Sequence, residues 1–230
     1  MQRLQKQKIE ISEMHTRMHT IWCQHIVSHY ESCLTKHGAS AKGMDWPNAK
    51  DLSIRFDVML NVINRTDKLL SVLDLGCGVG LLVDHLEKKG FSKKINYKGL
   101  DVSAKMVTAA KKRHPGRQFE IRDIINNPLP LGFVDFVIMN GVLTEKRGLR
   151  FEQMENYART LIKSAYDSCR YGLAFNVMSS HVDWQREDLF HWPLDRAVSF
   201  IVAECSRNIL IRMDYGLYEY TIYLYKTPNK

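Results

Sequence analysis

A glycine-rich segment near residue 75 contains the residues best suited to binding a ligand. The segment Val72–Gly80 reads VLDLGCGVG, and an amphipathic pattern begins directly after it at Leu81. Glycine residues let the backbone approach a ligand closely and adopt positive φ. In an open α/β sheet, ligands bind beyond the carboxyl ends of the strands. The segment therefore predicts a strand, a ligand-binding turn and a helix.

An acidic residue, Asp101, ends the next predicted strand, 21 residues after Gly80. A carboxylate at this place can accept hydrogen bonds from both hydroxyls of a ribose. Dinucleotide-binding turns carry a third glycine after two spacer residues, and this chain has Leu81 there. The spacing therefore argues against a dinucleotide and leaves another nucleoside-containing cofactor.

The elements that must position these residues alternate along the chain from residue 71. Short apolar runs alternate with amphipathic patterns, which predicts a parallel sheet covered by helices on both faces. The last two β-rich runs are separated by only three residues, so they must pair antiparallel. We expect strands at 72–75, 97–102, 118–122, 134–140, 171–177, 208–213 and 217–225, and helices at 52–63, 81–89, 104–113 and 151–166.

An apolar stripe runs through the first forty residues at steps of three and four, from Ile11 to Leu34. This period predicts a helix, with Gly38 as its C-terminal cap. Large apolar side chains gain about 1.5–3 kcal/mol each on burial, so the stripe needs a surface to cover. We expect residues 1–48 to form a helical cap over the core, residues 49–230.

Composition excludes several classes of protein. The 230 residues are 45% apolar and 25% charged, with a formal charge of +8, as in ordinary globular chains. No run reaches the roughly 18–20 apolar residues of a membrane span, and the polar N-terminus lacks a secretory signal. Five scattered cysteines without a Cys-x-x-Cys pair indicate free thiols in a reducing compartment, so we expect a cytoplasmic protein.

Four histidines near the N-terminus, His15, His19, His25 and His29, form two pairs four residues apart. This spacing can bind a metal from one helix face. No carboxylate or cysteine completes an obvious ligand set, so we interpret them as residues of a helix-packing interface and predict no metal site.

The Gly-x-Gly-x-Gly spacing, with Asp74 two residues before the first glycine, resembles the class I S-adenosylmethionine-dependent methyltransferases. The reversed final strand resembles that family as well, and the resemblance covers roughly residues 71–226. It implies S-adenosylmethionine as cofactor and S-adenosylhomocysteine as product. It also implies an α/β fold: a Rossmann-like seven-stranded sheet, mostly parallel with a reversed final strand, with helices on both faces and an N-terminal helical cap.

The resemblance carries the family's cofactor contacts onto individual residues. Asp74 matches the acid that holds the glycine loop and the cofactor amino group, Asp101 the acid that binds the ribose, and Asp123 the acid that binds the adenine amine. A helix N-cap is the alternative interpretation of Asp101 and Asp123. The full implied set is Asp74, Gly76, Cys77, Gly78, Gly80, Asp101, Val102, Met106, Asp123, Ile124, Asn140 and Gly141.

A narrower resemblance concerns residues before the glycine loop. The pairs at 37–38 (HG), 45–46 (DW) and 55–56 (RF) resemble a bacterial subgroup of small-molecule or sugar-associated methyltransferases. It implies that Arg55 binds the cofactor carboxylate through a bidentate fork; a surface cation is the alternative. We expect the substrate to be contacted by Tyr30, His37, Trp46 and Asn176.

Methyl transfer from a sulfonium needs mainly alignment and desolvation. An oxygen acceptor must also lose its proton to a base. His181 and Asp183 follow the fifth predicted strand, and histidine titrates near neutral pH. We therefore interpret them as base and orienting residue, with a solvated loop as the alternative. The aromatic segment 190–192 predicts either a lid or plain packing.

Three functions fit these observations. We expect a methyltransferase acting on a small molecule, with oxygen as the methyl acceptor. A nucleic-acid methyltransferase, acting on RNA, would suit the charge of +8, but the chain carries no recognisable RNA-binding module. A non-catalytic cofactor-binding partner protein is the third function. We expect a small-molecule acceptor and possible homodimer formation, and no membrane or nucleic-acid partner.

Overall fold

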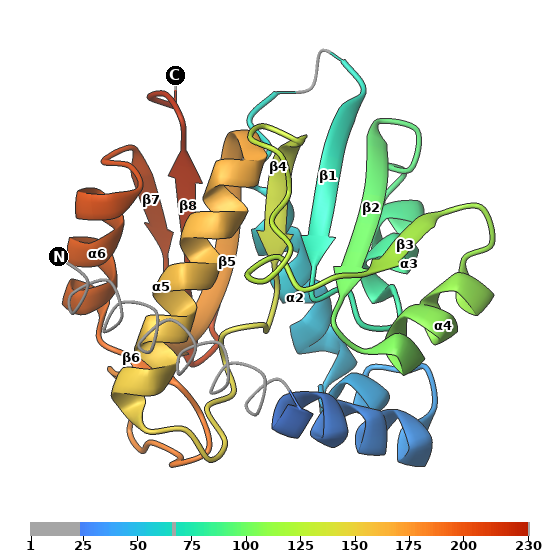
Figure 1. The fold of residues 1–230 in the computed structure, drawn as a ribbon, viewed down its shortest axis with the longest axis horizontal. Coiled ribbons are helices and arrows are strands. Elements are labelled where there is room, and N and C mark those ends of the chain that lie inside the picture. The colour runs from blue at the N-terminus through green and yellow to red at the C-terminus, as the bar shows by residue number, and fades with distance from the viewer. Residues whose placement is uncertain (1–23, 66–67, 230) are drawn as a thin grey trace, which may run out of the picture.

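The structure is a computed structural model that describes residues 24–65 and 68–229. Its centre is one sheet, in which seven strands follow the order β3-β2-β1-β4-β5-β8-β7 and β6 pairs with β5 beside them (Figure 1). The strands are β1 (Leu70–Leu75), β2 (Ile95–Asp101), β3 (Gln118–Ile121), β4 (Val134–Met139), β5 (Cys169–Ser179), β6 (His191–Trp192), β7 (Ile209–Arg212) and β8 (Glu219–Tyr225).

The sheet is parallel except at β8. Strands β1 to β5 pair only in parallel with one another, whereas β8 runs antiparallel to both β5 and β7. The prediction of a mostly parallel sheet with a reversed final strand is confirmed, and β8 lies between β5 and β7. The sheet has one strand more than expected because the two-residue β6 pairs with the end of β5. Two residues are too short to show a period of alternation.

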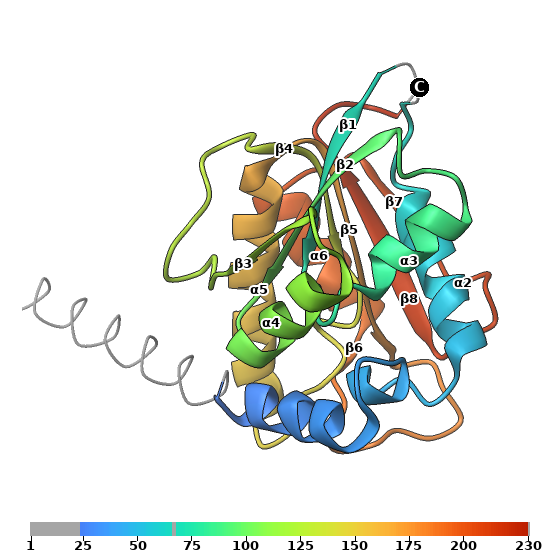
Figure 2. The same cartoon turned by 90° about the vertical axis from the view of Figure 1, so that its right-hand side faces the viewer.

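Helices cover both faces of the sheet, as the alternating pattern predicts. One hydrophobic cluster joins the sheet to α5 and α6, and a second joins its other face to α2, α3 and α4. Figure 2 shows α5 on one side of the sheet and α2 and α3 on the other. The helices are α2 (Ala49–Leu60), α3 (Leu81–Lys88), α4 (Ala104–Arg113), α5 (Phe151–Ser168) and α6 (Leu194–Glu204), with a 3-10 turn η1 (Lys42–Met44).

Residues 190–204, which include the strand β6 and the helix α6, differ from the sequence prediction. Helix α6 was missed, although Ala197, Phe200 and Ile201 are buried at a helical spacing. Phe190 and Trp192 are completely buried in the cluster with α5 and α6. The aromatic segment therefore packs in the core and does not form a lid.

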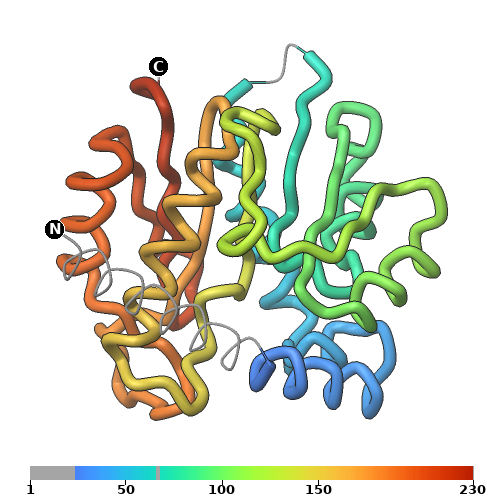
Figure 3. The backbone as a smooth tube through the Cα atoms, viewed as in Figure 1, coloured from blue at the N-terminus to red at the C-terminus, as the bar shows by residue number. Residues whose placement is uncertain are grey.

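The N-terminal part of the described chain lies at the carboxyl end of the parallel strands. Residues 24–37 are helical, and the short segment 38–41 connects them to η1. Figure 3 shows this segment, in blue, passing below the ends of β1 and β2. Trp22, His15 and His19 lie outside the described residues. Among the described residues, no helix has both the length and the apolar character of a membrane span.

Candidate active site

The glycine turn connects β1 to α3 with three left-handed residues. Gly76, Gly78 and Gly80 have φ values of 77°, 52° and 80°, which glycine adopts without steric cost. The N–H groups of Gly76 and Cys77 both donate to Leu100 O, at 2.8 and 3.0 Å. The turn is thus fixed to the end of β2, where the ribose-binding acid is expected.

Asp101 ties the turn to the start of α4. Its Oδ2 accepts a hydrogen bond from Gly78 N at 2.9 Å, and its Oδ1 accepts one from Ser103 N at 2.9 Å. Burial raises the pKa of Asp101, and these two backbone donors oppose the rise. The N-cap of α4 is Ser103, whose hydroxyl accepts from Met106 N. The N-cap interpretation of Asp101 is therefore wrong.

Two further carboxylates lie near the turn. Asp74 is 4% exposed in β1 and accepts a hydrogen bond from the Tyr97 hydroxyl at 2.8 Å. Burial raises the pKa of Asp74 to about 7. Asp123 follows β3 and accepts hydrogen bonds from Ile125 N and Asn126 Nδ2, at 2.9 and 2.7 Å. Asp123 thereby shapes the loop that carries it.

The cap packs directly onto the glycine positions of the core. A Cβ atom at Gly78 would lie 2.5 Å from Met44 Sδ, and one at Gly141 would lie 2.5 Å from Trp46 Cζ2. Met44 Sδ also accepts a hydrogen bond from Val79 N at 3.3 Å. Glycine is favoured at both positions because φ is positive, at 52° and 77°, and a Cβ there would also displace a cap side chain.

A cavity lies between the glycine turn and the cap. Its empty space, counted together with the open mouth, is about 1170 Å³. Predicted residues that line it are Tyr30, Trp46, Asp74, Gly76, Cys77, Gly78, Asp101, Val102, Met106, Asp123, Ile124, Asn140 and Gly141. Further lining residues include Ile26, Val27, Met44, Phe56, Ser103, Arg122, Val142, Glu145, Tyr157 and Leu161.

Comparison with known proteins identifies the family. Residues 72–164 match a family model described as a methyltransferase domain. The chain is also 31% identical over 173 residues to Rv1506c of Mycobacterium tuberculosis, a protein named as a methyltransferase; the match covers 73% of this chain and 99% of the relative. This chain belongs to the S-adenosylmethionine-dependent methyltransferases.

Solved structures share the fold of this methyltransferase. A Leishmania major S-adenosylmethionine-dependent methyltransferase matches with a TM-score of 0.63 and 14% identity, over 89% of this chain and 83% of that one. Magnesium protoporphyrin IX methyltransferase from Synechocystis, with bound S-adenosylmethionine, matches with a TM-score of 0.51 and 17% identity, over 77% of each chain. An Aquifex aeolicus methyltransferase matches with a TM-score of 0.56 and 17% identity, over 78% and 94%.

The cofactor is S-adenosylmethionine, and the cavity of this methyltransferase fits it chemically. Asp101, at the end of β2, offers a carboxylate for a ribose. Asp74 offers a second carboxylate for a cationic group, while Met106 and Ile124 line the cavity with apolar surface suited to a base. The cofactor-binding role of each residue stays a prediction that mutation can test.

Four of the predicted site residues lie away from the cavity lining. His181 and Asp183 are exposed, in the loop after β5, because β5 continues to Ser179 and carries the loop past the cavity. The solvated-loop interpretation fits their positions. His37 is exposed at the end of the helix 24–37, and Gly80 forms the N-cap of α3 behind the turn.

Arg55 and Asn176 also lie outside the lining and face a common partner. Arg55 Nε lies 3.0 Å from both carboxylate oxygens of Glu219. Asn176 Nδ2 donates to Glu219 Oε1 at 3.0 Å. The surface-cation interpretation of Arg55 is therefore wrong, because its guanidinium is paired with a carboxylate that is 2% exposed.

Glu145 is the carboxylate of the cavity that the sequence interpretation missed. Its side chain is 11% exposed, and Arg147 Nε lies 2.7 Å from its Oε2. Burial raises the pKa of Glu145, while the Arg147 guanidinium opposes the rise. The available signal was its position in the loop after β4, six residues beyond the last strand residue, Met139, at the edge of the sheet where ligands bind in open α/β folds.

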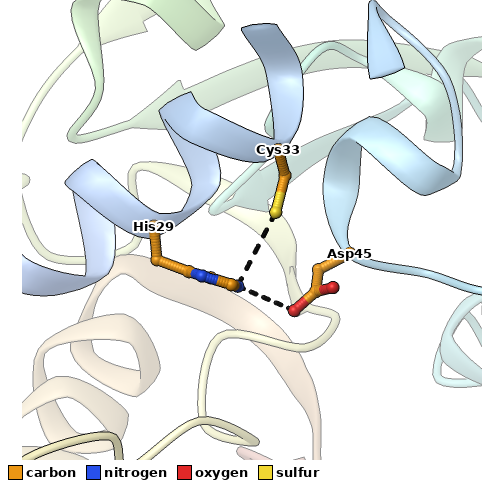
Figure 4. A group of neighbouring side chains, drawn as sticks. All are labelled: His29, Cys33 and Asp45. Carbon is orange, nitrogen blue, oxygen red and sulfur yellow. Dashed lines mark hydrogen bonds and ion pairs between the residues drawn. The ribbon is translucent and has the colours of Figure 1, made fainter. Parts of the chain in front are cut away.

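His29, Cys33 and Asp45 form a cluster of potential metal ligands within the cap (Figure 4). His29 Nε2 lies 2.7 Å from Asp45 Oδ2 and 3.8 Å from Cys33 Sγ. The potential ligand atoms lie within 4.8 Å of one another. However, Arg147 Nη2 lies 2.7 Å from His29 Nε2 and 3.4 Å from Asp45 Oδ2. A guanidinium cation thus takes the place that a metal ion would need.

Proposed function

We propose that this methyltransferase transfers a methyl group to an oxygen atom of a small molecule, and that Glu145 accepts the proton of that acceptor. The observation that carries the proposal is the composition of the cavity. Gly78 and Asp101 line it from the core, and Tyr30 and Met44 line it from the cap. Glu145 lines the same cavity. One enclosed space therefore contains residues suited to both the methyl donor and a hydroxyl acceptor.

The cap supports an acceptor of small size. The helix 24–37 lines the cavity with Ile26, Val27 and Tyr30. This helix therefore covers the side of the cavity that faces the cap. Such a cover restricts access and excludes water from the sulfonium. A structural neighbour is named for a small acceptor, magnesium protoporphyrin IX, and the resemblance to the sugar-associated subgroup also favours a hydroxyl-bearing compound.

The carboxylate of Glu145 supports transfer to oxygen. When bound, S-adenosylmethionine supplies a methyl group on an activated sulfonium. A neutral hydroxyl keeps its proton near pH 7, so a base accelerates its attack. Burial makes Glu145 more basic than an exposed glutamate, since it raises the pKa. The hydroxyl proton passes to Glu145 as the acceptor oxygen bonds to the methyl carbon, and the electron pair of the broken C–S bond stays on sulfur.

Tyr30, in the cap, is suited to donate a hydrogen bond to the acceptor. Burial and the nearby Glu145 carboxylate raise the pKa of Tyr30 well above its ordinary value. The phenol therefore keeps its proton throughout the physiological range. Since Tyr30 lines the same cavity as Glu145, it can donate a hydrogen bond while Glu145 accepts one, a pairing that suits a hydroxyl.

A transfer assay with radiolabelled S-adenosylmethionine tests the proposal. The protein is incubated with a deproteinised small-molecule extract and, separately, with total RNA. We expect label in the small-molecule fraction, in an ether linkage. Label in RNA would favour the nucleic-acid alternative, an N-methyl product would contradict the oxygen acceptor, and label in neither would favour the non-catalytic partner.

The Glu145→Gln variant tests the proton acceptor. Loss of general-base catalysis costs typically 10²–10⁴-fold, so we expect kcat to fall by about that factor. The affinity for S-adenosylhomocysteine should change little. Glu187→Gln makes the same chemical change on an exposed residue outside the cavity and serves as the control. Equal kcat in both variants would remove Glu145 from the mechanism.

A further inference from the structure

We infer that Glu219 is a positioning residue of the methyl-donor cavity, acting through Asn176 and Arg55. It does not line the cavity. Instead it joins two residues that do, Gly141 of the core and Trp46 of the cap. This inference rests on the geometry of the core and cap and is independent of the acceptor proposed above.

The core arm runs from Glu219 to Gly141. Glu219 Oε1 accepts a hydrogen bond from Asn176 Nδ2 at 3.0 Å, and Asn176 Oδ1 accepts one from Gly141 N at 2.7 Å. Asn176 is completely buried and Glu219 is 2% exposed. They lie on the antiparallel pair β5 and β8, where Asn176 pairs with Thr221 and Met178 with Glu219. The Asn176 amide therefore fixes the backbone directly after β4.

The cap arm runs from Glu219 to Trp46. Arg55 Nε donates to both oxygens of Glu219 at 3.0 Å. The guanidinium carbon of Arg55 lies 4.4 Å from the centroid of the Trp46 ring, within the range of a cation–π contact. Arg55 is on α2, so this arm connects the first helix after the cap to the cap itself.

The two arms meet at the cavity wall. Gly141 has φ of +77°, and a Cβ there would lie 2.5 Å from Trp46 Cζ2. The contacts therefore close a circuit: Gly141, Asn176, Glu219, Arg55, Trp46 and again Gly141. Loss of Asn176, Glu219 or Arg55 deprives a buried polar group of a hydrogen-bond partner, and an unsatisfied buried group costs more than a pair that is missing altogether.

The circuit also changes the interpretation of Arg55. A buried ion pair often stabilises a fold no more than apolar residues of the same volume would. The Arg55–Glu219 ion pair lies between two walls of the cavity, so we infer that its role is to keep these walls in position. Arg55 would act on the cofactor through Trp46, and not by binding the cofactor carboxylate directly.

The test compares Glu219→Gln with Glu155→Gln. Glu155 is a matched control: its side chain is 5% exposed, and it accepts from Trp192 Nε1 at 2.9 Å and pairs with Arg196, outside the cavity lining. Both variants should lower Tm. Only Glu219→Gln should weaken S-adenosylhomocysteine binding, by about threefold to thirtyfold, the range for residues that act on a ligand without touching it.

A second probe separates positioning from direct binding. 5′-Methylthioadenosine lacks the carboxylate of S-adenosylhomocysteine. Arg55→Lys keeps the charge but loses the planar fork, and it replaces Glu219→Gln if that variant does not fold. We expect both nucleosides to lose affinity by the same factor in each variant. A loss confined to S-adenosylhomocysteine would show direct carboxylate binding by Arg55, and affinities equal to those of Glu155→Gln would overturn the inference.

Trp46 provides a readout of the circuit itself. In Glu219→Gln, the fluorescence contribution of Trp46, obtained by difference from the same protein carrying Trp46→Phe, should shift towards the emission of a solvated indole. Glu155→Gln should leave that contribution in place. An unchanged Trp46 contribution in a Glu219→Gln protein with weakened binding would also overturn the inference, because the cap arm would then carry no effect.

Discussion

Asp74→Asn should stabilise this methyltransferase while it weakens cofactor binding. Asp74 is 4% exposed in β1, and the hydroxyl of Tyr97 donates to it at 2.8 Å. Burial raises its pKa from an ordinary 3.8 to about 7, since this one donor offsets only part of the lost hydration. Asparagine has nearly the same shape and carries no charge, so the substitution isolates the electrostatic cost.

The size of the effect follows from the two pKa values. A difference of about three pH units between folded and unfolded chains corresponds to about 4 kcal/mol. Between the two values the folded protein holds a proton that the unfolded chain has lost. The contribution of Asp74 to stability is therefore fully present below the unfolded pKa, declines as pH rises through about 7, and stays constant above.

Urea denaturation at about pH 4 and about pH 8 measures this difference. The free energy of unfolding of Asp74→Asn should equal that of the wild type at the lower pH and exceed it by about 4 kcal/mol at the higher. Asp135→Asn is the control of opposite sign. Against the desolvation of burial, hydrogen bonds from Ser71 and the Arg170 guanidinium hold the pKa of Asp135 below its ordinary value. That variant should lose stability, most strongly at the higher pH.

Cofactor binding should respond in the opposite direction. If ionised Asp74 holds the cofactor amino group, wild-type affinity for S-adenosylmethionine should rise with pH through about 7, and Asp74→Asn should lose both affinity and that dependence. An Asp74→Asn protein that is less stable than the wild type at both pH values would refute the reasoning on burial. Unchanged affinity would remove Asp74 from the cofactor site.

Three further substitutions test the geometry of the cavity. Gly78→Val should weaken S-adenosylhomocysteine binding in calorimetry, because a left-handed valine costs about 1–2 kcal/mol and its Cβ would displace the Met44 side chain that lines the cavity; binding equal to wild type would contradict the close approach at this turn. Asp101→Asn should weaken that binding by about tenfold to a hundredfold, as expected for one charged hydrogen bond, and an unchanged affinity would count against a ribose contact. Arg147→Ala should let Co²⁺ bind beside Cys33 with a sulfur-to-cobalt absorption band; wild-type protein should lack the band, and its absence in the variant would show that more than the guanidinium opposes a metal.

The residues that line the core side of the cavity could be predicted from the sequence because they are local. The glycine turn and Asp101 directly follow strands, and a parallel sheet brings the carboxyl ends of its strands to one edge. Helix α4 has the predicted bounds, since Ser103 and its apolar spacing mark it clearly. Among residues 24–65 and 68–229, the elements that were not predicted are the short strand β6, the helix α6 and the 3-10 turn η1.

The cap side of the cavity and Glu145 could not be predicted because tertiary packing selects these residues. Met44 ends the three-residue turn η1 and Glu145 lies in a loop, so neither shows a periodic pattern, and they line one cavity because the cap folds against the core. His181 and Asp183 have suitable chemistry, but β5 runs to Ser179 and carries them past the cavity. Residue types show which side chains could take part in a reaction. Tertiary packing decides which loops line the same cavity, and the sequence does not show this directly.

The carboxylates of the cavity share one electrostatic problem. Burial raises the pKa values of Asp74, Asp101 and Glu145, and all three line the same space. Ionised carboxylates in such a space destabilise the empty protein, and positive charge relieves them. S-Adenosylmethionine carries a sulfonium that its product lacks. The same buried acids that weaken the empty fold would therefore favour binding of the methyl donor over retention of the product.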